Sequence, residues 1–196
     1  MVLLEPDPPP GAGKSSFELI EIAKLFQELN LTQGMVFADL GCGFGRYSVA
    51  AAEFVGATGM VHALDLWPEG IRELSSRVSS YTNIRPVIAD VGERLPLPEG
   101  SVDVCFMATV LHDLVQTDKA RAAVKETARV LKPDGVLAIV EFKKIPGPPG
   151  PPAKIRLDPK EVESIVLPEG FVTKRFSEIG PYHYLLLFSR SAGARG

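Results

Sequence analysis

Five short apolar runs, separated by stretches of helical spacing, place the strongest constraint on the fold of this chain. The runs cover residues 35–40, 60–64, 85–89, 102–107 and 136–142. Helices are expected between most of them, at residues 46–55, 69–79 and 119–131. Short runs that are apolar on both faces and alternate with helices are typical of a parallel sheet covered on both sides. The pattern therefore predicts a doubly wound α/β fold with helices on both faces of the sheet.

The two ends of the chain extend this pattern. Apolar residues at helical spacing predict a helix over residues 16–29. After residue 142 we expect a proline-rich loop, a short helix at 158–166 and two strands joined by a turn at Gly180-Pro181. Such a hairpin makes the last strand antiparallel to the others.

The helix expected at residues 119–131 has signals at both ends. Thr117 can cap its start, since a threonine hydroxyl satisfies free backbone amides there. The sequence LKPDG then ends it, because Pro133 cannot continue a helix and Asp134-Gly135 favours a turn.

Composition bounds the class of protein. The 196 residues fit one domain, which we expect at residues 15–190, after a flexible arm at 1–14 and before a disordered tail at 191–196. A net charge of −3, without long runs of like charge, gives no electrostatic footprint for nucleic acid. No apolar stretch reaches the roughly 20 residues that span a bilayer, and the N-terminus lacks the basic start of a signal peptide. Two cysteines indicate no disulfide scaffold, so we expect a cytoplasmic protein.

Two short motifs invite other interpretations. GAGKS at residues 11–15 resembles part of a phosphate-binding loop, but Pro8 stands where that motif needs glycine and no strand precedes it. GPPGPP at residues 147–152 resembles collagen, but two triplets cannot hold a triple helix together. The segment is then a stiff spacer or a structured lid, and its place just after the carboxyl end of a strand favours a lid, since ligands bind at that edge of the sheet.

A glycine-rich turn, DLGCGFG, follows the first expected strand. Gly41, Gly43 and Gly45 have the spacing G-x-G-x-G, whereas the dinucleotide fingerprint is G-x-G-x-x-G. Asp39, just before the turn, would repel a pyrophosphate but suits an ammonium group with a sulfonium nearby. The turn therefore favours S-adenosylmethionine over NAD.

Two more acids end the strands that follow. Asp65 lies 20 residues after Gly45, where a carboxylate can accept from both ribose hydroxyls of either cofactor. Asp90 ends the third strand, where it can accept from an adenine amino group. An acid at such a place can also form a turn or cap a helix. Three of them on one edge of a parallel sheet, however, favour a cofactor site.

The motifs FADLGCGFG, VHALDLW, IADVGERLPLPEGSVDVCFMATVLHDL and LKPDGVLAIVEF resemble those of class I S-adenosylmethionine-dependent methyltransferases, over roughly residues 16–190. Within that superfamily the chain is most similar to the small-molecule branch that includes the ubiquinone/menaquinone C-methyltransferases. The resemblance implies a Rossmann-like sheet of seven strands in the order 3-2-1-4-5-7-6, with the last strand reversed.

The resemblance also implies S-adenosylmethionine as the cofactor, with no metal. Asp39, Gly41 and Gly43 would lie near its methionyl part. Asp65 would bind the ribose, and Asp90 with Val91 the adenine. Two further contacts are implied: Leu66 packed against the adenine, and the backbone of Met107 and Ala108 near the methionyl amine.

Methyl transfer needs no nucleophilic triad, because the donor is already activated and alignment can supply about 7–11 kcal/mol. A general base is required only if the acceptor must lose a proton. His112 is the candidate base, since a neutral imidazole can take a proton near pH 7. Alternatively, His112 hydrogen-bonds its own loop, and Asp113 is a solvated acid or a partner that orients the ring.

A second cluster is expected where the final hairpin meets the same edge of the sheet. Tyr182, a second candidate catalytic residue, and His183 would lie there beside Glu141. We expect Glu141 and His183 to contact the substrate, although this tyrosine and histidine can equally be ordinary edge-strand residues. Arg156 is expected to bind an anionic substrate or to be a surface charge.

The acceptor is expected to be an unidentified small molecule. Residues 108–111 read ATVL where nucleic-acid amino-methyltransferases of this fold carry an Asn-Pro-Pro-Tyr-like motif. Two cysteines are too few for an arsenite enzyme, and VLHDL differs from the quinone enzymes at that position. The expected activity is in-line methyl transfer by a monomer or homodimer. The alternatives are a non-catalytic S-adenosylmethionine-binding protein and an NAD-linked oxidoreductase.

Overall fold

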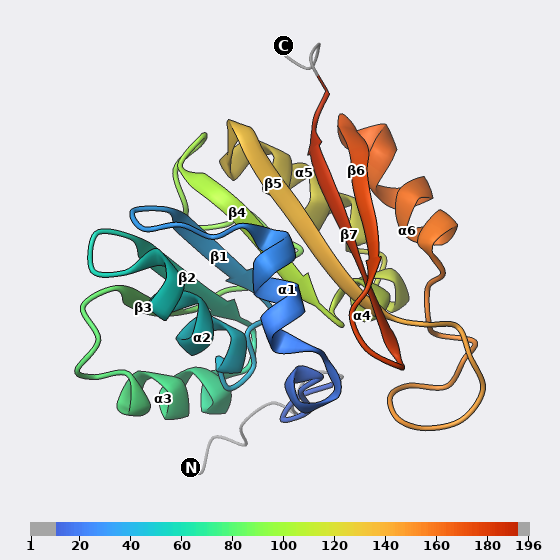
Figure 1. Ribbon diagram of the computed structural model, residues 1–196, viewed down its shortest axis with the longest axis horizontal. Helices are drawn as coiled ribbons and strands as arrows, with labels where there is room; N and C mark the ends of the chain where they lie inside the picture. Colours follow the sequence, from blue (N-terminus) through green and yellow to red (C-terminus); the bar gives the residue numbers. More distant parts are fainter. Residues whose placement is uncertain (1–10, 192–196) are drawn as a thin grey trace, which may run out of the picture.

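The computed structural model describes residues 11–191, which form one seven-stranded sheet with helices on both faces (Figure 1). The strands are β1 (Val36–Leu40), β2 (Met60–Asp65), β3 (Ile84–Ile88), β4 (Val102–Ala108), β5 (Leu131–Phe142), β6 (Phe171–Glu178) and β7 (His183–Arg190). They lie in the order β3-β2-β1-β4-β5-β7-β6. Neighbours from β3 to β5 pair in parallel, whereas β7 is antiparallel to both β5 and β6. The predicted strand order and reversed last strand are confirmed.

Helices connect the strands and divide between the two faces of the sheet. They are η1 (Phe17–Leu19), α1 (Ile22–Leu29), α2 (Arg46–Val55), α3 (Pro68–Arg77), α4 (Leu111–Gln116), α5 (Ala120–Val130), α6 (Pro159–Val166) and η2 (Leu167–Glu169). The buried residues of α1, α2 and α3 pack in one cluster, and those of α4, α5 and α6 pack in another. This is the doubly wound arrangement that the sequence predicts.

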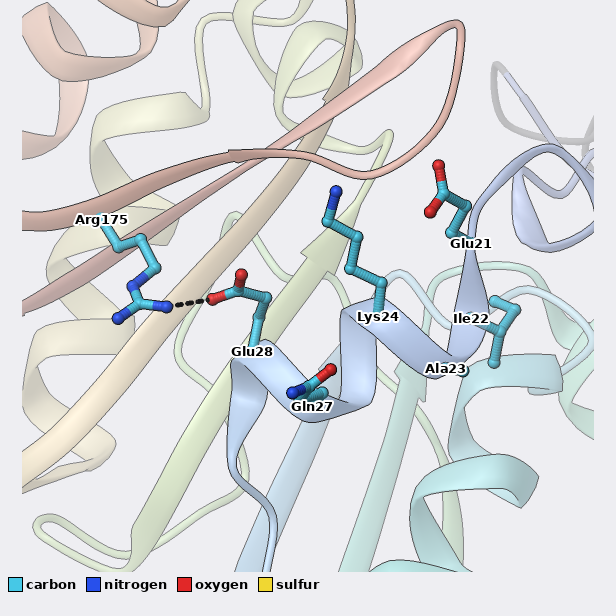
Figure 2. Close-up of a pocket in the computed structure, with 7 residues that line it drawn as sticks. All are labelled: Glu21, Ile22, Ala23, Lys24, Gln27, Glu28 and Arg175. Atoms are coloured by element: carbon cyan, nitrogen blue, oxygen red, sulfur yellow. Dashed lines mark hydrogen bonds and ion pairs between the residues drawn. The ribbon is translucent and has the colours of Figure 1, made fainter.

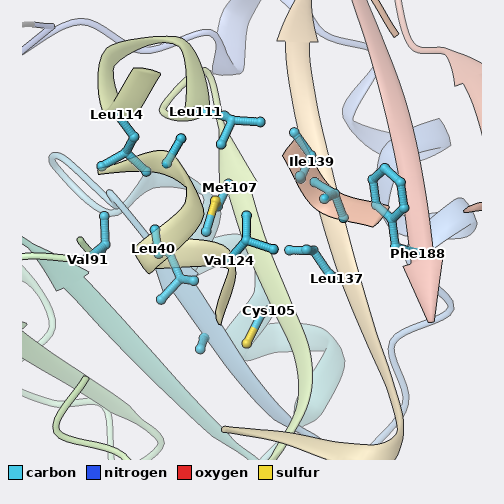
Figure 3. Packing of buried hydrophobic residues seen from close by; sticks show 14 of the residues in the cluster. Leu40, Val91, Cys105, Met107, Leu111, Leu114, Val124, Leu137, Ile139 and Phe188 are labelled. Atoms are coloured by element: carbon cyan, nitrogen blue, oxygen red, sulfur yellow. The ribbon is translucent and has the colours of Figure 1, made fainter. Parts of the chain in front are cut away.

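Each face of the sheet buries its own apolar cluster, and β1 contributes to both. Phe37 belongs to the cluster under α1–α3, whereas Leu40 belongs to the cluster under α4–α6, which Figure 3 shows. The second cluster also contains Leu111 of α4 and Val124 of α5, both fully buried. Burial of each such side chain stabilises the fold by about 1.5–3 kcal/mol. The sheet is therefore anchored on both faces, which fixes the positions at which its strands end.

The helix expected at residues 16–29 is interrupted. After η1, Ile20 adopts an extended conformation (φ −117°, ψ 145°), and α1 begins only at Ile22. Within the break, Ile20 is buried and the backbone amide of Glu21 donates to the carbonyl of Ile179 at 3.0 Å. The interruption thus docks the N-terminal segment against the turn before β7.

The sequence did not predict α4, and Thr117 belongs to it rather than to α5. The Thr117 hydroxyl lies 3.2 Å from each of two α4 carbonyls, those of Asp113 and Leu114. The N-cap of α5 is Lys119, whose side chain makes no capping hydrogen bond to the helix. The capping prediction was wrong because the six residues of α4 are too few to show helical periodicity.

The LKPDG segment also differs from its prediction. β5 begins at Leu131, which pairs with Val102 of β4, and the register then shifts before Val136. The expected turn is therefore the irregular start of a long strand.

Parts of the predicted terminal segments lie outside the described residues, namely 1–10 of the arm and 192–196 of the tail. Residues 11–14 form a turn in which the amide of Lys14 donates to the carbonyl of Gly11 at 3.0 Å.

Candidate active site

The parallel strands reach their carboxyl ends at one edge of the sheet (Figure 1). Asp39 lies near the end of β1, Asp65 ends β2, and Glu141 lies near the end of β5. Ligands of open α/β sheets bind outside this edge, because the loops that follow the strands meet there. We therefore take it as the candidate active site.

β1 ends in a turn that favours glycine. Gly41 and Gly43 have positive φ angles of 83° and 53°. A β-carbon at Gly41 would collide with the side chain of Val110, whereas one at Gly43 would meet no atom within 4 Å. The backbone at Gly43 is therefore open on one side, as the close approach of a ligand requires.

Asp65 connects this turn to the one that follows β2 by hydrogen bonds to both. Its carboxylate accepts from the backbone amide of Gly43 at 2.7 Å and from that of Trp67 at 2.8 Å. A carboxylate has about four lone-pair sites, so acceptor capacity remains for ribose hydroxyls. Its predicted role at the ribose is consistent with this position.

Asp90 has partners that the sequence did not suggest. Its carboxylate accepts from the ammonium of Lys119 at 2.6 Å and from the backbone amide of Gly92 at 2.8 Å. An adenine amino group would have to share this carboxylate with the lysine. The predicted adenine contact at Asp90 therefore stays a prediction, with Lys119 as a competing donor.

Exposed apolar surface lies beside Asp90. Leu66 is 50% exposed, as the predicted packing against adenine requires, and Ile88 is 55% exposed. Ile88 is not among the predicted contacts, because the sequence of a strand does not indicate which face lacks a covering helix. Val91 is buried in the core, so only its backbone could face a ligand.

Asp39 is a buried acid with one strong partner. Its side chain is 1% exposed and accepts from the hydroxyl of Ser48 at 2.5 Å. Burial raises the pKa of Asp39 to about 7, although the Ser48 hydrogen bond acts in the opposite direction. Ser48 was not predicted from the sequence; it lies in the first turn of α2, which brings its hydroxyl to Asp39 of β1.

At the end of β4, Met107 can offer a ligand only its backbone. The Met107 side chain is fully buried in the cluster under α4–α6, whereas Ala108 is half-buried. Thr109 then adopts a left-handed conformation with a φ of 58°, which turns the chain into α4. The prediction that the backbone here faces the cofactor remains compatible with this geometry.

His112, the candidate base, forms a buried pair with Glu141. The ring Nδ1 lies 2.8 Å from Glu141 Oε2, and the backbone amide of His112 donates to Oε1 at 3.1 Å. Burial acts to lower the pKa of His112, but the hydrogen bond and charge of Glu141 outweigh it, so the pKa is raised. Glu141 was expected to contact the substrate; in the structure it holds the imidazole.

Asp113 lies on the other side of the ring. Its Oδ1 is 3.6 Å from Nε2 of His112, and its side chain is partly exposed. Burial raises the pKa of Asp113, while the nearby charge of His112 lowers it. The imidazole is thus flanked by two carboxyl groups.

Tyr182 and His183 lie where the final hairpin meets this edge. Tyr182 is half-buried in the turn, and its carbonyl accepts from the amide of Lys143 at 2.7 Å. His183 opens β7, pairs with Phe142 of β5 and is fully buried. Both are therefore at the predicted edge, and their roles stay predictions.

Arg156 is buried, so the expectation that it is a surface charge was wrong. Its side chain holds the proline-rich loop together. Its guanidinium donates to five backbone carbonyls at 2.6–3.2 Å, those of Lys143, Ile145, Gly147, Pro149 and Pro151. Arginine has five N–H donors, and each of them is used here. In this conformation Arg156 has no donor left for an anionic substrate, so that prediction is not supported.

Two comparisons with known sequences identify the family. The family described as "Methyltransferase domain" matches residues 37–135, which include the glycine turn, Asp65, Asp90 and His112. The chain belongs to this methyltransferase family. The ubiquinone/menaquinone biosynthesis C-methyltransferase UbiE of Paraburkholderia phymatum is 32% identical over 118 residues, which is 60% of this chain and 47% of that protein. A demethylmenaquinone methyltransferase of Bacillus licheniformis is 29% identical over the same length, or 49% of that protein. The chain spans about half the length of these relatives.

Solved structures extend the likeness over nearly the whole chain. A SAM-dependent methyltransferase from Aquifex aeolicus superposes with a TM-score of 0.81 at 29% identity, covering 92% of this chain and 93% of that one. The trans-methyltransferase CalH, solved with SAH, shares the fold with a TM-score of 0.66 at 19% identity, over 88% of this chain and 56% of that one. This methyltransferase therefore has the class I fold, with S-adenosylmethionine as its cofactor.

The residues at the edge fit this cofactor. Gly43 leaves backbone open to a ligand, Asp65 keeps acceptor capacity, and Leu66 presents apolar surface. Asp39 can become an anion close to a cationic group, which would lower its pKa again. In residues 11–191 there is no helix with the length and apolar character needed to cross a bilayer.

A surface groove of about 740 Å³ lies elsewhere, along α1 (Figure 2). It is lined by Glu21, Ile22, Ala23, Lys24, Gln27, Glu28 and Arg175. The ion pair of Glu28 with Arg175 crosses it at 2.7 Å and lowers the pKa of Glu28. None of these residues belongs to the turns at the carboxyl edge, so this groove is not the cofactor site.

Proposed function

We propose that this methyltransferase methylates a small molecule that must lose a proton, with His112 as the general base. The buried pair of His112 and Glu141 at the carboxyl edge is the observation that carries the proposal. When bound, S-adenosylmethionine supplies a methyl group that is already activated on a sulfonium, and alignment can account for about 7–11 kcal/mol of the barrier.

The cofactor would be held mainly by the residues at the ends of β1 and β2. Asp39 would face its ammonium group, Asp65 its ribose, and Leu66 its adenine. Gly41 and Gly43 would allow the backbone to approach. These assignments rest on the position of each residue at the edge and on the resemblance to the family.

The proton would move from the acceptor to Nε2 of His112. Because the Glu141 carboxylate accepts from Nδ1, the neutral imidazole carries its proton there and keeps a lone pair on Nε2. After proton uptake, the imidazolium lies between the carboxyl groups of Glu141 and Asp113, which stabilise its charge. An acceptor with a hydroxyl, a thiol or an acidic C–H group fits this arrangement.

The same charges favour an uncharged acceptor. Two carboxyl groups flank the base, and the guanidinium of Arg156 is fully occupied by the proline-rich loop. An anionic acceptor would be repelled by Glu141 and Asp113. The names of the curated relatives point to quinone biosynthesis, so hydroquinones and phenols are the first candidates to test.

The test is to incubate the protein with methyl-labelled S-adenosylmethionine and a metabolite extract, and to identify the labelled product. We expect His112→Ala to lower the rate by about 10²–10⁴-fold. The affinity for S-adenosylhomocysteine, measured by calorimetry, should change little. His62→Gln is the matched control, since His62 lies within β2 rather than at the edge, and it should keep the wild-type rate.

Glu141→Gln tests the positioning role. Glu141 raises the pKa of His112, so its loss should move the rise of the pH–rate profile to lower pH. An unchanged rate in His112→Ala would remove His112 from the mechanism. A wild-type protein that binds the cofactor tightly but labels nothing would instead favour a non-catalytic binding protein.

A further inference from the structure

His183 is a buried side chain whose hydrogen-bonding capacity is not used. It is fully buried, and neither ring nitrogen has a hydrogen-bond partner in the part of the chain that the structure describes. The backbone of Leu19 lies close enough to act on the ring, but not in hydrogen-bonding geometry. Unpartnered buried polar groups destabilise a fold and are rare, so their retention calls for a function.

His183 lies at the same end of the sheet as His112, the candidate base. Its ring centroid is 4.1 Å from that of Phe142, and the Phe142 ring is 6.5 Å from that of His112. Phe142 itself is held by Arg156, whose guanidinium lies 5.3 Å from the ring centroid. The two imidazoles therefore share one aromatic neighbour that is fixed in place.

The environment keeps His183 neutral. Burial lowers the pKa of His183 to about 4, outweighing the opposite effect of the Leu19 backbone, and the charges of Arg156 and Lys143 lower it further. A neutral imidazole offers one N–H donor and one acceptor nitrogen. It is therefore suited to an uncharged oxygen group, such as a hydroxyl or a carbonyl, and not to an ion pair.

We propose that His183 is a specificity-determining residue that hydrogen-bonds an uncharged oxygen group of the methyl acceptor beside Phe142. This inference rests on the proposed function, in which His112 takes the proton from the same molecule. Strand alternation places His183 on the α1–α3 face and Glu141, which holds His112, on the α4–α6 face. The acceptor would thus be a neutral compound that reaches past Phe142 at the sheet edge, with one oxygen group at each imidazole. A β-carbon on Gly180 would lie 2.9 Å from the Leu19 carbonyl, so η1 packs on the turn before His183. Because His183 is fully buried, the proposal requires a local movement for the acceptor to enter.

The first experiment compares His183→Phe, which keeps a ring of similar shape, with His183→Asn, which keeps a donor and an acceptor. With methyl-labelled S-adenosylmethionine and the metabolite extract, His183→Phe should lose at least tenfold in rate, and His183→Asn should lose less. Thermal unfolding of His183→Phe should occur at the wild-type temperature or above it, because an unpartnered polar group is removed. S-adenosylhomocysteine should bind both variants within about twofold of wild type. His62→Phe, the same change within β2, should leave the rate unaltered.

The second experiment does not depend on turnover. Protein with ¹⁵N-labelled histidine is titrated with 1,4-hydroquinone and, separately, with benzoate, in the presence of S-adenosylhomocysteine. Hydroquinone should shift the ring nitrogen signals of His183, which His183→Asn assigns by their loss, and benzoate should not. If the wild type labels no metabolite but hydroquinone shifts His183, the proposed function fails while the subsite stands. Any one of three results would overturn the subsite: a wild-type rate in His183→Phe, a lower unfolding temperature in both variants, or no shift of the His183 signals with hydroquinone.

Discussion

At the scale of single residues, Asp39 shows how the fold sets the chemistry of the site. An ordinary aspartate has a pKa near 4 and is charged at neutral pH. Complete burial raises the pKa of Asp39 to about 7, so near neutral pH a large fraction carries a proton. The approach of a cationic ligand would favour the anion again. Asp39 is therefore placed to respond to the cofactor rather than to hold a fixed charge.

This shift gives a prediction about stability. The folded pKa lies above the unfolded one, so the folded state binds the proton more tightly and stability falls as the pH rises from about 4 to about 7. The effect is on the order of a few kcal/mol, since each pKa unit corresponds to about 1.4 kcal/mol. Asp39→Asn, which cannot ionise, should lack this loss. Urea unfolding at a series of pH values measures it, with exposed Asp134→Asn as control. Parallel stability curves for wild type and Asp39→Asn would contradict the assignment.

Residue types and spacing were enough to place several site residues, but not their partners. Asp39 and Asp65 lie at the strand ends and Gly43 in the turn, as predicted, because strand ends and glycine turns are local features of the sequence. Glu141 holds His112 from 29 residues away, and Lys119 reaches Asp90 across the same separation. Such pairs depend on how elements pack, which periodicity does not encode.

At the scale of elements, the proline-rich loop after β5 depends on one side chain. The five carbonyls bound by Arg156 belong to residues between Lys143 and Pro151, a stretch that is part of no helix or strand. Gly150 lies against the Phe142 ring, where a β-carbon would come within 2.6 Å. The loop therefore has a defined conformation that is centred on a buried cation.

We predict that Arg156→Lys destabilises this loop. A lysine offers three donors on one atom and cannot satisfy five carbonyls, so the free energy of unfolding should fall by about 2–4 kcal/mol. Limited proteolysis with mass spectrometry should show new cleavage between residues 145 and 152. Arg175→Lys is the control, because Arg175 makes an ion pair at the surface. Equal resistance of the loop in wild type and Arg156→Lys would count against this role.

The elements themselves follow from the sequence to different degrees. Short apolar runs predicted the bounds of β1, β2 and β4 to within one residue. The break at Ile20 and the short helix α4 escaped prediction, since both are fixed by packing against other parts of the chain. Local patterns identify elements that could form alone, and tertiary contacts decide the rest.

At the scale of the whole molecule, the N-terminal segment crosses the edge that carries the site. A β-carbon at Gly11 would lie 3.0 Å from the Asp113 carboxylate, and one at Gly13 would lie 3.5 Å from the Trp67 ring. The segment therefore runs between the loop after β2 and the start of α4. A ligand at the glycine turn would lie next to this N-terminal segment. Entry and release of that ligand are then coupled to the attachment of this segment.

A buried hydrogen bond contributes to this attachment, which gives the last prediction. The hydroxyls of Ser16 and Tyr47 lie 2.9 Å apart, both residues are buried, and Phe17 packs edge-on against the Tyr47 ring at 5.1 Å. Tyr47→Phe removes only the hydroxyl. Because a net hydrogen bond contributes about 0.5–1.5 kcal/mol, S-adenosylhomocysteine should dissociate about 2–10-fold faster.

Stopped-flow displacement measures that rate, and hydrogen exchange of residues 11–21 reports the attachment of the segment directly. Ser16→Ala should have a similar effect, and the double variant should add little to either single change, because both remove the same bond. Tyr81→Phe, at a partly exposed tyrosine after α3, is the matched control. Fully additive effects would show that Ser16 and Tyr47 act separately. Unchanged dissociation with faster exchange would show that the segment opens without controlling the ligand.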